Sequence, residues 1–280
     1  MDLDHEHGAG LPIRRGLAPV YASSLAVALL MAVASIAGLA YRAVIYPTDE
    51  LLRTFVANDV ASLLLGMPIL LGSMGLARRG RMMGLLCWPG ALLFVLYNYL
   101  AYVFALPLGL ASLLHLALVV LSAYGLLALV AVIDAESVKR SLAGLVPERI
   151  GGAVLAGLGL LFFLRALVVL LGAVTSGTAV ARTELAVNVS DSLVSPIWVI
   201  GGALLWRRRS LGYVLGLGLL LGISLLFVAL VVLMFVQPLL TAAPVAFVDA
   251  IVILGMGLIC FIPCSLFARG VASSHPRPVA

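Results

Sequence analysis

The sequence predicts an all-α fold, a polytopic membrane helical bundle of about eight transmembrane helices. Hydrophobic residues make up 64% of the 280 residues and charged residues only 10%, with a mean hydropathy of +1.22. A soluble domain carries about 25% charged residues, so water is excluded as the main solvent of this chain. Several apolar runs are long enough for the roughly 20 residues that cross a bilayer as a helix. These runs are continuous and not alternating, which favours helices over a closed barrel.

The first half of the chain contains four predicted spans. The first is interpreted as a retained span and not a signal peptide, because Asp2, Asp4 and Glu6 precede it and no clear small-residue cleavage site follows it. The segment 46–56 is expected to lie along the membrane surface as a short amphipathic helix, before the second span opens at Asp59. The four predicted spans are 21–44, 59–77, 82–106 and 110–133.

The second half contains four more predicted spans. A polar segment, 134–149, joins the two halves, and a small polar stretch, 175–190, precedes the sixth span. Pro238 stops the seventh span, because proline disrupts a continuing helix. The four predicted spans are 150–174, 191–206, 211–236 and 244–267.

The basic residues predict the orientation of the bundle. With eight spans, thirteen of the 17 basic side chains fall on one side, three on the other and one inside a span. The positive-inside rule assigns the richer side to the cytoplasm, so both termini are expected there and the protein is expected in the cell (plasma) membrane. The thirteen are Arg14, Arg15, Arg78, Arg79, Arg81, Lys139, Arg140, Arg149, Arg207, Arg208, Arg209, Arg269 and Arg277.

The two halves resemble each other at an offset near 128 residues. The arginine cluster in 77–84 aligns with that in 206–212, and each follows a span that contains a proline, Pro68 or Pro196. Four spans are an even number, so two copies would share one orientation about an axis along the membrane normal. The alternative is that two positively flanked spans simply look alike. The predicted units are a cytoplasmic tail 1–20, a first repeat 21–134, a cytoplasmic loop 135–149, a second repeat 150–268 and a cytoplasmic tail 269–280.

Four polar residues inside different spans form the candidate site. Asn98, His115, Arg165 and Asp249 are each expected about 8 to 14 Å beneath the outer surface, at 1.5 Å of rise per residue. Polar groups at such depth are costly and are functional candidates by default. This shared depth predicts an outward-facing polar pocket.

Each candidate also has a structural interpretation. Arg165 and Asp249 form an ion pair in the functional interpretation, whereas in the alternative Arg165 extends outward to the interface and Asp249 neutralises it or lies near the headgroups. His115 is either a proton carrier or a side chain that satisfies a backbone carbonyl. Asp59 and Asp191 lie at the outer rim, where they are expected to cap the helices that they open.

The motifs of common enzymes are missing from the sequence. It contains no Walker loop, zinc-protease motif, dinucleotide fingerprint or nucleophile elbow. We therefore expect no cofactor and no metal site, and an enzyme is less favoured than a transporter. The net charge of +5 does not indicate nucleic-acid binding, because the basic residues cluster between apolar runs. The expected partners are the lipid bilayer and a small solute or anion, and the oligomeric state stays open.

Several short segments carry a resemblance. These are Asn58-Asp59, Pro68, the cluster 77–81, Tyr97-Asn98-Tyr99 and the segment 204–213. Together they resemble a loose group of uncharacterised prokaryotic multi-pass membrane proteins, over about two thirds of the chain. The resemblance implies a multi-pass fold and carries no activity.

Two functions follow as hypotheses. The first is a small-solute transporter or permease-like protein, in which Arg165 binds an anionic solute in the outward-facing pocket. The second is a non-transporting sensor, assembly factor or lipid-binding component, favoured by the lack of a visibly interrupted span.

Overall fold

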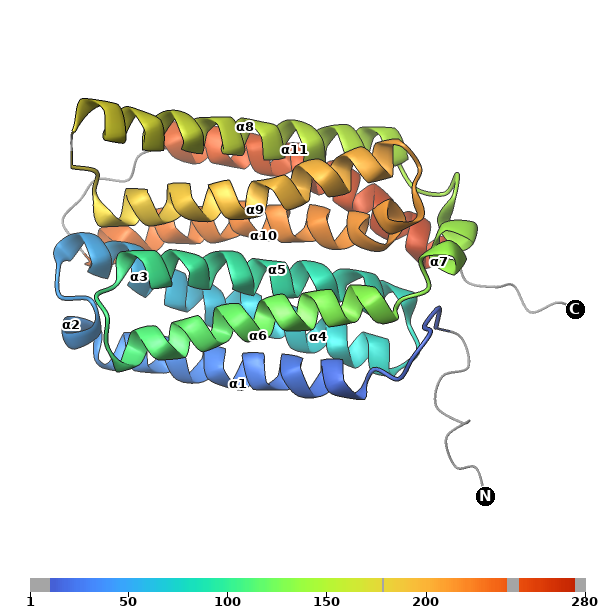
Figure 1. The fold of residues 1–280 in the computed structure, drawn as a ribbon, viewed down its shortest axis with the longest axis horizontal. Coiled ribbons are helices and arrows are strands. Elements are labelled where there is room, and N and C mark those ends of the chain that lie inside the picture. The colour runs from blue at the N-terminus through green and yellow to red at the C-terminus, as the bar shows by residue number, and fades with distance from the viewer. Residues whose placement is uncertain (1–10, 178, 241–246, 275–280) are drawn as a thin grey trace, which may run out of the picture.

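The structure, a computed structural model, describes residues 11–177, 179–240 and 247–274. Within these ranges eight helices are long and apolar enough to cross a membrane. They run side by side along the long axis of the molecule (Figure 1). The predicted all-α membrane bundle of about eight spans is therefore confirmed.

The elements follow one another with short connections. Between the first two spans lies a single helical turn, and a longer amphipathic helix joins the two halves of the chain. The elements are α1 (Ala18–Ala40), α2 (Arg42–Ile45), α3 (Asp49–Ala61), the π-helical turn η1 (Ser62–Gly66), α4 (Met67–Arg78), α5 (Met82–Ala105), α6 (Leu110–Val132), α7 (Ala135–Leu142), α8 (Glu148–Ser176), α9 (Arg182–Trp206), α10 (Ser210–Leu240) and α11 (Phe247–Ser273).

The two ends of the bundle are distinguished here by the positions of the ends of the described chain. We call the end with the first and last described residues, Leu11 and Ser274, the proximal end, and the end where α1 and α5 stop the distal end (Figure 1). At the proximal end the carboxylate of Asp134 accepts hydrogen bonds from the hydroxyl of Ser137 (2.6 Å) and the guanidinium of Arg14 (3.2 Å). These two donors lower the pKa of Asp134, Ser137 more than Arg14. The ion pair ties the start of the described chain to the connection between α6 and α7.

The prediction that residues 46–56 form a separate helix on the membrane surface is wrong. The second span begins at Asp49 and continues as one helical segment through α3, the π-helical turn η1 and α4 to Arg78. Thr48 starts it, since its Oγ1 accepts a hydrogen bond from the amide of Leu51 (3.3 Å), and acidic residues in the first turn favour the positive end of the helix dipole. Asp59 consequently lies in the helix interior and not at its start.

The predicted start of the sixth span is wrong for a similar reason. α8 continues to Ser176 and ends with Gly177 in the left-handed conformation (φ 64°), and α9 begins at Arg182. Most of the stretch predicted as polar connection is therefore helix, and Asp191 also lies in a helix interior. Pro244, predicted to open the eighth span, lies outside the described residues, as do residues 1–10 and 275–280 of the two predicted tails.

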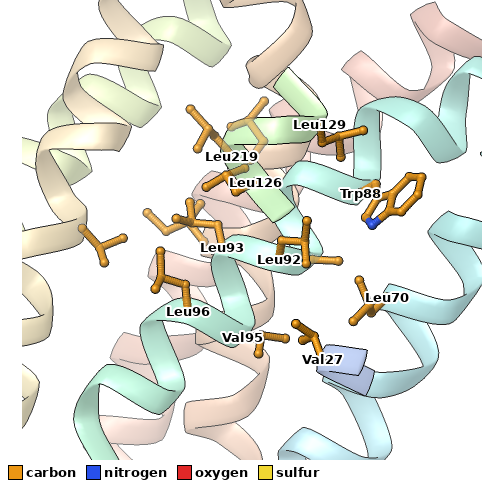
Figure 2. Packing of buried hydrophobic residues seen from close by; sticks show 14 of the residues in the cluster. Val27, Leu70, Trp88, Leu92, Leu93, Val95, Leu96, Leu126, Leu129 and Leu219 are labelled. Carbon is orange, nitrogen blue, oxygen red and sulfur yellow. The ribbon is translucent and has the colours of Figure 1, made fainter. Parts of the chain in front are cut away.

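The helix α5 is the centre of the bundle. Its side chains pack against α4 and α6 of the first half and against α9 and α10 of the second, and Trp88 and Tyr99 hydrogen-bond to serines of α1. Figure 2 shows Leu92, Leu93, Val95 and Leu96 of α5 among apolar side chains from several neighbouring helices. Residues of α5 are therefore the ones most able to contact both halves of the molecule.

Glycines at the 128-residue offset make matching contacts. Gly84 lies against Ala77 and Leu76, and Gly212 lies against their counterparts Leu205 and Leu204. Gly90 and Gly218, also 128 residues apart, lie against each other where α5 crosses α10. Near a two-fold axis a residue can contact its own counterpart, so these contacts are of the kind that the predicted four-plus-four duplication would produce.

Candidate functional site

A cavity of about 430 Å³ lies between the two halves of the bundle, in its distal part. Its wall comes from α3 and α5 of the first half and from α8, α9, α10 and α11 of the second. Most of the wall is apolar, with Trp198, Phe162 and Phe227 as large aromatic surfaces. The polar side chains in the wall are Thr54, Asn58, Tyr97, Asn98, Arg165, Thr183 and Asp191.

Arg165 pairs with Asp191 and not with Asp249. The nearest guanidinium nitrogen of Arg165 lies 3.4 Å from Oδ2 of Asp191, whereas Asp249 is exposed in the first turn of α11. The predicted Arg165–Asp249 pair is wrong because α9 begins at Arg182, nine residues before Asp191, so that Asp191 reaches the depth of Arg165. The predicted cap role of Asp191 is wrong for the same reason.

The ion pair is unequally buried. The side chain of Asp191 is 5% exposed and that of Arg165 is 54% exposed. Tyr97 donates its hydroxyl to Oδ1 of Asp191 (2.8 Å), so both carboxylate oxygens are engaged. Arg165 has five N–H donors and forms one long bond to Asp191, which leaves a cation at the cavity wall with donors to spare.

Asn98 lies in the cavity wall, as predicted for a pocket residue. It is buried, and its amide nitrogen donates to the carbonyl oxygen of Phe94, one turn earlier on α5 (3.0 Å). Together with Asn58 of α3 and Thr183 of α9 it gives the cavity an uncharged polar side. The structure therefore brings together Asn98 and Arg165 of the predicted pocket.

His115 lies away from this cavity, so its predicted place in the same pocket is wrong. Its ring is buried against those of Tyr99 and Tyr102, with ring centroids 5.6 and 4.7 Å away. Its Nδ1 is buried without a hydrogen-bond partner, and the residue lines a second pocket of about 510 Å³ between α1 and α6. A lone histidine at the predicted depth does not reveal which side of its helix it occupies.

Asp59 is the second buried carboxylate of the molecule's distal part, and it is 1% exposed. Oδ2 accepts a hydrogen bond from the hydroxyl of Tyr46 (2.6 Å), and Oδ1 accepts one from Tyr102 (2.8 Å). The predicted cap is wrong, because Thr48 caps this helix about 15 Å away along its axis. Burial, followed by the adjacent carboxylate, raises the pKa of Tyr46 well above its usual value, so Tyr46 keeps its proton to donate.

Tyr46, Tyr97 and Tyr102 are the site residues that the sequence reasoning missed. Tyr97 and Tyr102 lie five residues apart on α5 and contact different carboxylates, Asp191 and Asp59. In the sequence they look like an aromatic belt at the membrane interface. The available signal was the presence of two acidic residues in neighbouring apolar runs, since buried carboxylates need donors.

A hydrogen-bonded contact between the halves lies beside the cavity, at the distal ends of α3 and α9. Oε1 of Glu50, in the first turn of α3, accepts bonds from the amide of Thr183 (2.9 Å) and from its hydroxyl. Thr183 stands in the first turn of α9, where free amides and the helix dipole attract an anion. The contact joins α3 to α9 beside a wall residue of the cavity.

Over the ranges that the structure describes, no three His, Cys, Asp or Glu side chains gather as they would around a metal ion. The arrangement instead provides an apolar cavity with one available cation and several neutral donors. Comparison of the chain with known protein families, with curated proteins and with solved structures finds no match.

Proposed function

We propose that this protein is a permease-like carrier of the plasma membrane that binds a small amphipathic anion in the cavity between its halves. The observation that carries the proposal is the half-exposed guanidinium of Arg165 in an otherwise apolar wall. The excess of basic residues at the proximal end orients that end to the cytoplasm. The cavity then opens toward the outside.

The wall chemistry suits a solute with two different ends. Arg165 can bind an acidic group, because a guanidinium donates paired hydrogen bonds to carboxylate, sulfonate or phosphate oxygens. Asn98, Asn58 and Thr183 add neutral donors beside it. Trp198, Phe162 and the apolar residues of α10 then accept the apolar part of the solute.

The position of the cavity supports transport more than simple binding. Substrate sites of many carriers lie at the interface between structural repeats, which rock against each other. Here the cavity lies between the two halves. The hydrogen bonds from Thr183 to Glu50 join the halves beside the cavity, at the distal end of the bundle. Breaking that contact would open the cavity without unfolding either half.

A lipid-binding component that does not transport is the second candidate. The observation in its favour is the dominance of apolar side chains in the wall, which also suits an acyl chain. Its other support, the lack of an interrupted span, is weakened by the π-helical turn Ser62–Gly66 inside the second span. The two candidates differ in whether the bound molecule crosses the membrane.

The first test uses an alkyl sulfonate of medium length that carries bromine at its far end. Bromine quenches tryptophan fluorescence at contact, and Trp198 lies in the cavity wall. We expect saturable quenching in the purified protein that disappears in Trp198→Phe. Arg165→Ala is expected to weaken binding about tenfold, the effect of losing one charge-assisted hydrogen bond of about 1.5 kcal/mol.

Arg182→Ala is the matched control, since Arg182 starts α9 at the same end but lies outside the cavity wall. Transport is then measured as uptake of the radiolabelled sulfonate into vesicles that contain the protein. A sulfonate keeps its charge at every pH used and crosses lipid slowly by itself. Equal binding and uptake by wild type and Arg165→Ala would refute the proposed site, and binding without uptake would favour the lipid-binding candidate.

A further inference from the structure

We infer that Asp59 is a proton-binding site, and that its proton is coupled to the solute cavity through α3. The proton site stands on the contacts of Asp59 itself. The coupling rests on the proposed carrier function.

The Asp59 carboxylate is held tightly on both of its oxygens. Both oxygens accept bonds from tyrosine hydroxyls, Tyr46 at 2.6 Å and Tyr102 at 2.8 Å. Gly38 of α1 lies so close to Oδ2 and to the Tyr46 hydroxyl that a Cβ at this position would collide with both. The site is closely packed and admits no large ligand.

The two buried carboxylates differ in their partners. Asp191 has a tyrosine and a cation, Arg165. Asp59 has two tyrosines, and no basic side chain of the described residues forms an ion pair with it. An ionised carboxylate in a membrane span normally requires a cation. A proton can take that role at Asp59, because the neutral carboxyl needs no partner charge.

The groups that contact Asp59 are uncharged hydroxyls. From the segment before α3 comes Tyr46, from α5 come Tyr102 and Tyr99, and from α6 comes the buried His115 beyond their rings. Of the other helices that pack on α3, α1 and α10 contain no charged residue, and the charged residues of α2 and α9 form no ion pair with Asp59. Two hydroxyl donors offset part of the cost of the ionised form, so the site can hold either protonation state.

A short path of contacts joins Asp59 to the cavity. The ring of Phe55 lines the cavity on one side and lies 4.3 Å, centroid to centroid, from the ring of Tyr102 on the other. The carbonyl oxygen of Phe55 also lies 3.2 Å from the Tyr102 hydroxyl. Asn58, the residue before Asp59, lines the cavity as well. A change in the bonds of Asp59 therefore reaches two residues of the cavity wall directly.

The helix is able to change shape at this point. The π-helical turn begins three residues after Asp59, and such turns are wider and less regular than α-helix and occur often at functional sites. The ring of His115 packs against Tyr102, its Nδ1 has no hydrogen-bond partner, and the residue lines the second pocket. It is therefore a polar group on the α6 side of the Asp59 site. Proton uptake at Asp59 would thus alter α3 next to the solute.

The test of the proton site needs no solute. Infrared difference spectra of the full-length protein in lipid vesicles, acidic against alkaline, report the carbonyl stretch of a protonated carboxylic acid. We expect one such band to be lost in Asp59→Asn and kept in Asp191→Asn, the matched control. If Asp59→Asn fails to fold, Tyr102→Phe is used, and loss of one donor to the ionised form is expected to move the midpoint of the band to higher pH. A band that survives in Asp59→Asn, or an unmoved midpoint in Tyr102→Phe, overturns the site.

The test of coupling uses the alkyl sulfonate, whose own charge is independent of pH. An imposed pH gradient, acidic outside, is expected to raise its uptake several-fold in wild type and to have no effect in Asp59→Asn. Uptake driven by a sodium gradient and not by the pH gradient overturns the coupling. If wild type takes up no sulfonate while the infrared band behaves as expected, the proton site is confirmed and the carrier proposal is the part that fails.

Discussion

At the scale of residues, the molecule treats its two interior aspartates differently. Asp191 is neutralised by Arg165 at the edge of a cavity, and Asp59 is enclosed by Tyr46 and Tyr102. A buried carboxylate is tolerated only when its oxygens have donors or a counter-charge. Under the two proposals these environments correspond to different tasks: Asp191 holds Arg165 beside the solute, and Asp59 binds a proton.

Gly38 offers a test of how tightly the Asp59 site is packed. Gly38→Ala is expected to lower the free energy of unfolding by about 1 to 3 kcal/mol, because the added methyl group collides with the carboxylate and with Tyr46. The matched control is Gly72→Ala on α4, where a Cβ meets nothing within 4 Å and the change should stay within about 0.5 kcal/mol. Thermal unfolding in detergent measures both, and equal stability of the two variants would contradict the packing described for Asp59.

The residue-level predictions from sequence succeeded for depth and failed for direction. Asn98 and Arg165 do lie in one cavity, because depth follows from counting residues along a helix. Asp249 and His115 lie at similar counts yet face elsewhere. Which way a side chain faces depends on helix rotation, and in a membrane an apolar sequence fixes that rotation only weakly because lipid and protein interior are both apolar.

At the scale of elements, the π-helical turn Ser62–Gly66 has a local cause. Pro68 lacks an N–H, and its ring would clash with the carbonyl of Leu64, four residues earlier in a regular α-helix. The wider turn moves that carbonyl away. Pro68 in the sequence was therefore a signal that the second span could be irregular, although it did not indicate a π-helical turn.

A one-residue deletion tests this account of the turn. Removing Leu64, an exposed residue in the turn, should leave a regular helix in which Asp59 and α4 keep their faces, since a π-helical turn accommodates one extra residue. We expect the variant to fold with reduced sulfonate uptake and with a free energy of unfolding lowered by about 3 kcal/mol, because Pro68 then clashes with the carbonyl four residues earlier in the regular helix. Deletion of Leu71, also exposed but within regular α4, should rotate one end of the span by about 100° and abolish folding. Equal yields of folded protein from both deletions would disprove the register argument.

Helix boundaries were the least predictable feature of the elements. The spans that begin at Asp49 and Arg182 open with polar residues and were expected to start about ten residues later. Polar side chains within these segments are stabilised by bonds to other helices, such as Glu50 with Thr183, which the sequence alone does not show. That error in the starting points displaced Asp59 and Asp191 from the expected rim into the interior.

At the scale of the whole molecule, the contact of Gly90 with Gly218 brings the backbones of the two halves together. Gly90→Ala is expected to cost about 3 kcal/mol or more, because its Cβ would collide with the carbonyl of Gly218. Gly218→Ala should cost about 1 kcal/mol, since its Cβ would lie 2.8 Å from the amide nitrogen of Gly90 and needs a smaller shift. Thermal unfolding compares them with Gly157→Ala, where a Cβ meets open space. A Gly90→Ala variant as stable as Gly157→Ala would argue against a close approach of the halves at this point.

The global architecture was the most predictable level. Hydropathy predicted eight spans, and the distribution of basic residues predicted an even number of them. The first and last described residues lie at the same end of the bundle, as an even number of spans requires (Figure 1). The neighbours of each helix were not predictable, because every span offers a similar apolar surface. The pairing of α8 with α9, which brings Arg165 to Asp191, was therefore missed.

The placement of Tyr97 and Tyr102 on one helix has a thermodynamic consequence. Any tilt or rotation of α5 changes the hydrogen bonds of Asp191 and Asp59 together. If a proton on Asp59 strengthens solute binding by some factor, linkage requires that the solute strengthen proton binding by the same factor. That reciprocity holds by whichever route the coupling passes, and α5, whose two hydroxyls contact both carboxylates, gives a second connection beside the path through α3.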